Sequence, residues 1–189
     1  MRWGQYMFGF LWAATFYCLF VFMRSARPDW RQVWAWPEVN WQNLRLILLR
    51  FLLAVLAMIA FTAWYDPDRL FVLFHAHPEI IPRILVLYPV LSALPQEFVF
   101  CTFFFWRYGT LFNTPRRIIL ASAAAFAFAH VLFINPVAPP LSLIAGLIFA
   151  QTYQKTRSLA LVTLEHGLYG NALFLIGLGW YFYHGAIPS

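Results

Sequence analysis

The sequence predicts an all-α integral membrane protein, a bundle of about six transmembrane helices with short interfacial segments between them. Of its 189 residues, 62% are hydrophobic and only 11% are charged, whereas about a quarter of a soluble domain is charged. Apolar stretches near the 20 residues needed to span a bilayer recur along the chain. The 13 basic residues lie near the ends of these stretches and form no single cluster, so we expect the lipid bilayer, and no nucleic acid, as a partner. No composition break divides the chain, which predicts a single transmembrane domain over residues 1–189.

The first half of the chain holds two of the expected spans. Residues 5–23 form the first span, and because no small-residue cleavage site follows, we interpret it as retained rather than as a signal peptide. The tryptophan-rich residues 24–45 predict an interfacial loop, since tryptophan favours the headgroup level. A second span is expected over residues 46–65. The semi-polar residues 70–83 then predict a short interfacial segment.

Four further spans are expected in the second half. Residues 84–106 form the third, which Pro89 and Pro95 should kink. The fourth and the short fifth are expected over residues 118–134 and 141–153. The last runs over residues 159–183, where several glycines allow close helix packing.

The basic residues predict the orientation in the membrane. With alternating spans, one side receives only Arg2, Arg69 and Arg83, and Arg50 falls one turn inside the second span, from where it could snorkel to the edge. Because basic loops stay in the cytoplasm, we expect both termini outside the cytoplasm. The other side receives nine basic residues: Arg24, Arg27, Arg31, Arg45, Arg107, Arg116, Arg117, Lys155 and Arg157.

Several polar residues fall inside the expected spans, where ionisable groups are costly and usually functional. Glu97, His130, His166 and Asn171 lie roughly 12 to 20 Å from the cytoplasmic ends of their spans, at a rise of about 1.5 Å per residue. Three separate spans therefore bring polar groups to one layer of the membrane. A lone histidine would more often be a packing residue, but a buried carboxylate needs a partner. We interpret the set as one functional site.

Three short motifs carry a resemblance to a known family. Gln96-Glu97-Phe98-Val99-Phe100-Cys101 is similar to the Glu-Glu-x-x-x-Arg motif of the CAAX-protease and bacteriocin-processing (Abi, CPBP) intramembrane proteases. Their Phe-x-x-x-His motif is present from Phe126 to His130, and their His-x-x-x-Asn motif is approximated by His166 to Asn171. The motifs occur in the family's order and in successive spans. The resemblance places a catalytic core over residues 84–183.

The chain departs from the family pattern at three positions. Gln96 replaces the first glutamate, and Cys101 replaces the arginine. The third motif is one residue longer, which turns Asn171 about 140° away from His166 on a regular helix. A bulge at Gly170 would restore the facing, and such bulges are frequent at functional sites.

The resemblance implies an intramembrane endopeptidase that cuts a membrane-tethered peptide or protein substrate by means of an activated water. Glu97 is the expected base, His130 orients the same water, and His166 and Asn171 donate hydrogen bonds to the oxyanion. The resemblance to peptide maturation and immunity proteins suggests a bacterial inner (plasma) membrane protein.

Other interpretations stay open. Glu97, His130 and His166 could instead hold a zinc ion with an open position for water, and the sequence does not choose between zinc and a metal-free mechanism. Gln96 and Phe126, the first residues of the first two motifs, are expected to contact the substrate. The departures at Gln96 and Cys101 support the alternative of a catalytically inactive family member that acts as a membrane peptide-binding or immunity protein.

Overall fold

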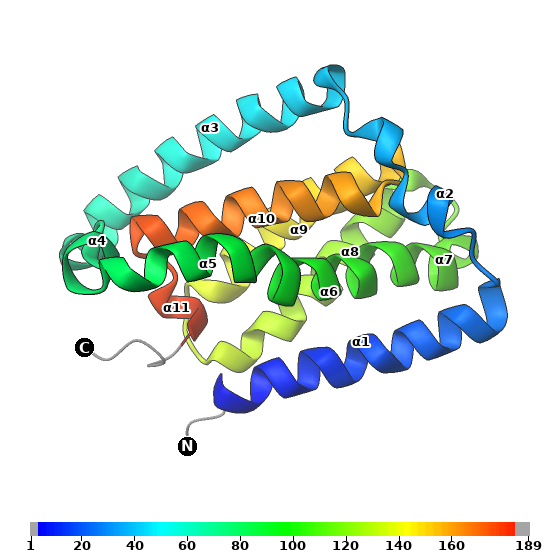
Figure 1. Cartoon of the computed structure of the whole chain (residues 1–189), viewed down its shortest axis with the longest axis horizontal. Helices are drawn as coiled ribbons and strands as arrows, with labels where there is room; N and C mark the ends of the chain where they lie inside the picture. Colours follow the sequence, from blue (N-terminus) through cyan, green and yellow to red (C-terminus); the bar gives the residue numbers. More distant parts are fainter. Residues whose placement is uncertain (1–3, 184–189) are drawn as a thin grey trace.

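The computed structural model describes residues 4–183, and every regular element in this range is helical (Figure 1). Five helices among these residues are long and apolar enough to cross a membrane, which confirms the predicted all-α membrane fold. Many of their outward side chains are apolar, such as Phe16 and Leu53, which are 61% and 60% exposed. The five spans are Tyr6–Ala26, Trp41–Tyr65, Pro78–Leu111, Pro115–Phe133 and Leu159–Ile176.

The helices follow one another in the order of their labels. Short 3-10 and π turns join several of them into longer rods. The bounds are α1 Gly4–Ala26, α2 Trp30–Trp34, α3 Trp41–Tyr65, α4 Val72–Ala76, α5 Ile81–Tyr88, α6 Leu94–Glu97, α7 Phe104–Tyr108, α8 Pro115–His130, α9 Ala138–Thr156, α10 Leu159–Ile176 and α11 Trp180–Tyr183.

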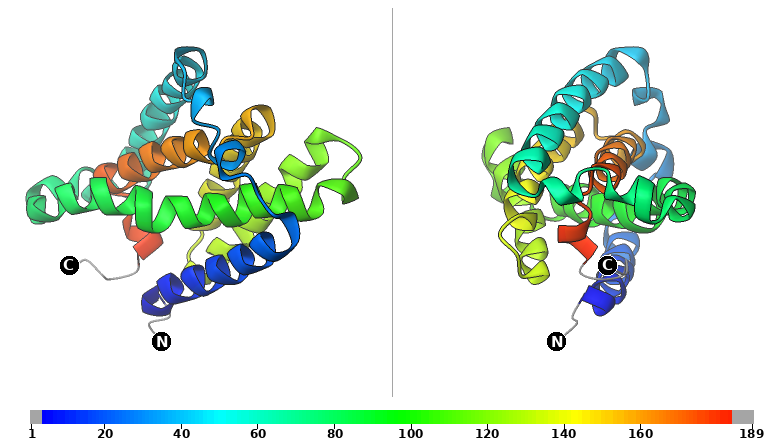
Figure 2. Two further views of the ribbon diagram at one scale, coloured as in Figure 1. Left: turned by 45° about the vertical axis from the view of Figure 1, so that its right-hand side comes forward. Right: turned by 90° about the vertical axis from the view of Figure 1, so that its left-hand side faces the viewer.

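Helix α10 is the central helix of the bundle. In its apolar window 67% of the residues are buried, against 11% to 33% in the other four spans. It packs against α3, α9 and the rod that contains α5 and α6, and Figure 2 shows it enclosed by these elements. Side chains of α10 can therefore meet side chains from several other helices.

The predicted fifth span forms as α9, Ala138–Thr156, and is longer than the expected residues 141–153. It packs along α8. Its last turns carry Gln151, Gln154 and Lys155, which explains why α9 is less apolar than the five spans above. The bundle thus has five strongly apolar helices and a sixth, more polar one.

The third span is one continuous helical rod, Pro78–Leu111. The rod contains two π turns, Pro89–Ala93 before α6 and Phe98–Phe103 after it, and the first of them lies at Pro89 and directly precedes Pro95. A wider turn relieves the missing N–H and the ring clash that proline imposes on an α-helix. Helix α6, which carries Gln96 and Glu97, is therefore flanked by π turns on both sides.

Several predicted boundaries were wrong. The third span begins at Pro78 instead of residue 84, so the end of the predicted interfacial segment 70–83 belongs to the rod. Helix α3 begins at Trp41 instead of residue 46, because the Asn40 side-chain oxygen caps it by accepting from the Asn43 N–H at 3.1 Å. The last span does not continue to residue 183: α10 ends at Ile176, where Gly177 adopts a φ of 115°. A Cβ at Gly177 would overlap the Arg69 carbonyl oxygen, so this turn requires glycine.

Arg50 does not snorkel to the membrane edge as expected. Its Nη2 lies 3.1 Å from Glu165 Oε1 on α10 and donates to Thr152 Oγ1 on α9 at 2.9 Å. The Glu165 side chain is completely buried and does not face solvent. The ion pair joins α3 to α10, and the hydrogen bond to Thr152 joins α3 to α9.

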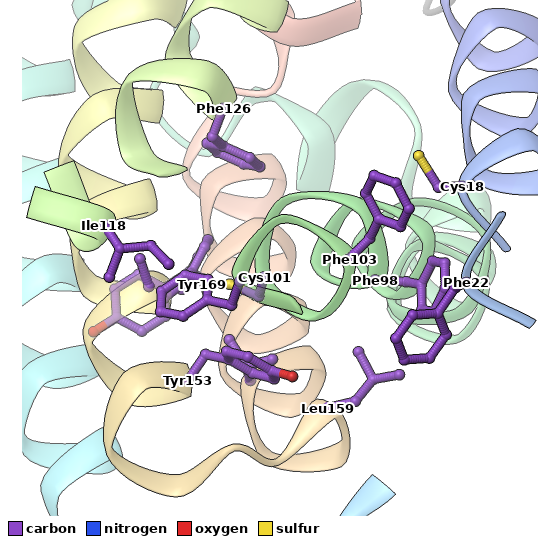
Figure 3. Packing of buried hydrophobic residues seen from close by; sticks show 14 residues of the cluster. Cys18, Phe22, Phe98, Cys101, Phe103, Ile118, Phe126, Tyr153, Leu159 and Tyr169 are labelled. Atoms are coloured by element: carbon purple, nitrogen blue, oxygen red, sulfur yellow. The ribbon is translucent and has the colours of Figure 1, made fainter. Parts of the chain in front are cut away.

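Aromatic side chains pack around the rod that contains α6, Pro78–Leu111. Phe22 of α1 packs edge-on against Phe98, with ring centroids 5.7 Å apart. Figure 3 shows these two rings gathered with Phe103 on one side of the rod, while Cys101 and Tyr169 lie on the other. Because the rod is packed on both sides, the directions of Gln96 and Glu97 are fixed.

Candidate active site

A cavity of about 560 Å³ lies between the helices. Apolar side chains from α1, α3, α8, α9 and α10 form most of its wall. A cavity of this size with a few convergent polar groups is typical of a ligand site. Its polar lining residues are Tyr88, Ser92, Gln96, His130, Ser142, His166 and Tyr169.

The strongest polar contact at the cavity joins α6 to α10. His166 Nδ1 lies 2.7 Å from Glu97 Oε1, and both residues are buried, with exposed fractions of 4% and 1%. An ionised Glu97 can only accept, so Nδ1 carries the proton and donates it to the carboxylate. In the neutral imidazole the second ring nitrogen, Nε2, then has a lone pair. Glu97 lies behind His166 and does not line the cavity.

The side chain of Tyr88, the last residue of α5, forms a hydrogen bond with that second nitrogen. Its hydroxyl lies 2.9 Å from His166 Nε2, and since Nε2 has a lone pair, the hydroxyl donates. No motif pointed to Tyr88 in the sequence. The feature of the sequence that relates to Tyr88 is Gly170, one helical turn after His166. Because glycine has no Cβ, it leaves room for the Tyr88 ring, which a Cβ at this position would overlap.

His130 and Phe126 form the adjacent wall. His130 Nδ1 donates to the Phe126 carbonyl oxygen at 2.7 Å, which leaves His130 Nε2 as an acceptor. The Phe126 ring contacts His130 and His166, with centroids 4.6 and 5.7 Å apart. Phe149 stacks on His166, with ring centroids 4.6 Å apart. The structure therefore brings Glu97, His130 and His166 to one region, as the depth arithmetic predicted.

Gln96 faces the cavity, whereas its neighbour Glu97 faces α10. Gln96 Nε2 donates to Ser92 Oγ at 2.9 Å, and its buried Oε1 has no partner among the described residues. Successive helical residues point about 100° apart, which explains why Gln96 faces the cavity while Glu97 faces α10. In this geometry Glu97 does not line the cavity but contacts His166, which does, and its second oxygen, Oε2, is buried without a hydrogen-bond partner among residues 4–183.

Asn171 does not join the other predicted residues. Helix α10 is a regular α-helix through Gly170. The bulge that would have turned Asn171 towards the site therefore does not form. The Asn171 amide donates instead to the Leu85 carbonyl oxygen of α5 at 3.2 Å. We therefore assign it no contact with the reacting groups.

The residues present do not fit the zinc alternative. Among residues 4–183, no three histidine, cysteine, aspartate or glutamate side chains converge as a metal site requires. Glu97 and His166 direct their nearest atoms at each other, and the remaining His166 nitrogen bonds Tyr88. The mechanism proposed below therefore includes no metal ion.

Comparison with protein families supports the resemblance seen in the motifs. The family described as "Type II CAAX prenyl endopeptidase Rce1-like" matches residues 78–172, which are 95 of the 189 residues. Comparisons with curated proteins and with solved structures give no match. The matched stretch begins with the rod that carries Glu97 and includes His130 and His166. The chain therefore belongs to the Rce1-like family of type II CAAX prenyl endopeptidases.

Proposed function

We propose that this protein is an intramembrane endopeptidase that hydrolyses a peptide bond of a membrane-tethered protein or peptide. The observation that carries the proposal is the buried Glu97–His166 hydrogen bond of 2.7 Å at the wall of an apolar cavity. A buried carboxylate and imidazole in this arrangement form a proton acceptor, as in hydrolases that use a histidine base. Membership of an endopeptidase family supports peptide hydrolysis as the reaction.

The pair supplies the base of the reaction. His166 is the final acceptor of the proton released by the attacking water, and Glu97 stabilises the imidazolium that forms, strongly because little water surrounds it. His130 Nε2 accepts a hydrogen bond from the same water. The water oxygen bonds to the substrate carbonyl carbon, and the leaving amine takes the proton back when the C–N bond breaks.

Gln96 and Phe126 provide contacts to the substrate. The Gln96 Oε1 atom, which has no partner among residues 4–183, can accept from a peptide N–H. A buried acceptor without a partner costs about 1–3 kcal/mol, so a substrate that satisfies it gains affinity. Phe126 forms an apolar wall next to both histidines.

Replacing His166 by alanine tests the proposed function. We expect cleavage of a fluorogenic, membrane-tethered peptide by the purified protein to fall by about 10²–10⁴-fold, the usual contribution of a positioned base. The matched control is His75→Ala, because His75 is an exposed histidine of α4, and this variant should cleave as the unmodified protein does. Unchanged cleavage by His166→Ala contradicts the proposal.

One observation favours a second candidate, an inactive member that binds a membrane peptide or serves as an immunity protein. Gln96 takes the cavity-facing position, and an amide cannot accept a proton from water. Under this alternative the unmodified protein binds the tethered peptide without cutting it. The Gln96→Glu variant would then gain cleavage, whereas under the first proposal the unmodified protein already cleaves.

We also propose that the protein lies in a bacterial plasma membrane with both termini outside the cytoplasm. The ends of α1 and α9 and helix α7 carry Arg24, Arg157 and Arg107, and Figure 1 places α2 and α7 at the end of the bundle opposite α4 and α11. Arg2, assigned to the far side, lies outside the described residues. Basic ends face the cytoplasm.

Reporter fusions measure this orientation. In a bacterial host, a C-terminal alkaline phosphatase should be active and a C-terminal green fluorescent protein should be dark, because only the former matures outside the cytoplasm. The reverse pattern of the two reporters would show that the assigned orientation is inverted.

A further inference from the structure

The Tyr88 hydroxyl engages the Nε2 atom of His166, and both residues line the cavity. It lies 2.9 Å from His166 Nε2, while His166 Nδ1 lies 2.7 Å from Glu97. Three side chains from α5, α10 and α6 therefore form one continuous hydrogen-bonded chain. Both imidazole nitrogens are engaged, so a water cannot bond to Nε2 without first displacing the tyrosine hydroxyl.

The position of the Tyr88 ring is fixed by the space above Gly170. A Cβ at Gly170 would overlap the Cε1, Cζ and hydroxyl oxygen atoms of Tyr88. The ring packs edge-on against Phe174 and His166, with centroids 5.3 and 5.9 Å apart. The ring and its hydroxyl therefore have a defined place, and Tyr88 lines the cavity together with Gln96 and His166.

We propose that Tyr88 relays the proton between the attacking water and His166, an inference that rests on the proposed function. When the water oxygen bonds to the carbonyl carbon, the water proton passes to the Tyr88 oxygen while the Tyr88 hydroxyl proton passes to His166 Nε2. When the C–N bond breaks, the leaving nitrogen takes the Tyr88 proton and His166 returns its proton to Tyr88. One water and one peptide bond become one carboxyl and one amine, and the side chains return to their starting state.

Replacing Tyr88 by phenylalanine tests the relay, because phenylalanine keeps the ring over Gly170 and removes only the oxygen. We expect kcat to fall at least about 100-fold, as for loss of a proton-transfer group, with little change in KM or melting temperature. An unchanged kcat would mean that Tyr88 only packs. A raised kcat would mean that the hydroxyl merely blocks Nε2, and either result overturns the relay.

A second readout separates a relay from a structural role. If two protons move together in the limiting step, the rate of the unmodified protein should depend on the deuterium fraction of the solvent along a curve rather than a straight line. A straight line would contradict the relay. The matched control is Tyr153→Phe, since Tyr153 is a buried tyrosine of α9 that does not line the cavity, and this variant should keep the curve and the rate.

The two proposals can fail separately. If the unmodified protein cleaves, His166→Ala does not, and Tyr88→Phe retains full kcat, the relay is wrong and the proposed function stands. If the unmodified protein binds but cleaves none of the tethered peptides, both are wrong.

Discussion

Replacing Glu97 by glutamine should lower kcat by about 10³–10⁴-fold while the protein remains folded. Glutamine has nearly the same shape, and its side-chain oxygen can still accept from His166 Nδ1, which now lies 2.7 Å away. It lacks the negative charge that stabilises the imidazolium, and its amide can turn to donate and so hold the ring in the wrong tautomer. The same change behind a catalytic histidine in other hydrolases costs about 10⁴-fold in kcat.

The measurement is kcat on a membrane-tethered peptide, with melting temperature as the check on folding. Glu79→Gln is the matched control: the Glu79 side chain is 66% exposed and pairs with His77 at 3.3 Å, and an exposed pair of this kind contributes little. It should cleave normally. If Glu97→Gln kept more than about a tenth of the normal kcat, a loss of less than about 1.4 kcal/mol, Glu97 would not support the base.

Replacing Arg50 by methionine should destabilise the protein by about 3 kcal/mol. Methionine fills a similar length but leaves the fully buried Glu165 without its partner at 3.1 Å. Breaking a buried pair typically costs about 3–5 kcal/mol, and the lower end applies because the Arg50 side chain is 33% exposed. Unfolding by denaturing detergent, followed by circular dichroism, measures the loss.

The double variant Arg50→Met, Glu165→Gln should recover most of that stability, because no charge is then left buried without a partner. Arg45→Met provides the control, since Arg45 is an exposed arginine on the same helix and its loss should change stability by less than about 0.5 kcal/mol. Equal losses in the single and double variants would mean that the Arg50 side chain matters for packing and not for its charge.

Composition and charge were enough to predict the membrane bundle, because lipid-facing helices must be long and apolar whatever they pack against. Depth arithmetic likewise placed Glu97 and His166 in one layer, and their side chains meet. The start of α3 depends on a local cap, Asn40 on Asn43, that was present in the sequence, whereas the end of α10 depends on a tertiary contact that a linear reading does not contain. Gly177 ends α10 because its backbone must pass close to Arg69.

The directions of individual side chains were harder to predict. Arg50 was assigned to the membrane edge because its buried partner, Glu165, is more than a hundred residues away in the chain. The role of Tyr88 depends on the space left by Gly170, which becomes visible only when α5 lies on α10. Asn171 needed a bulge that the regular helix does not have. The roles of these residues in catalysis stay predictions until they are tested.

The two π turns around α6 have a consequence for how this site can evolve. Each such turn holds one residue more than an α-helical turn would need, and removing one residue rotates everything beyond it by about 100°. A deletion in Pro89–Ala93 would turn Tyr88 out of phase with Glu97, so the two could no longer meet His166 together. A deletion in Phe98–Phe103 would instead rotate the packed half of the rod against α1. Point substitutions can change the chemistry of this site. A change in the length of the rod between Tyr88 and Glu97 would instead separate these two residues, so the number of residues between them is tightly constrained.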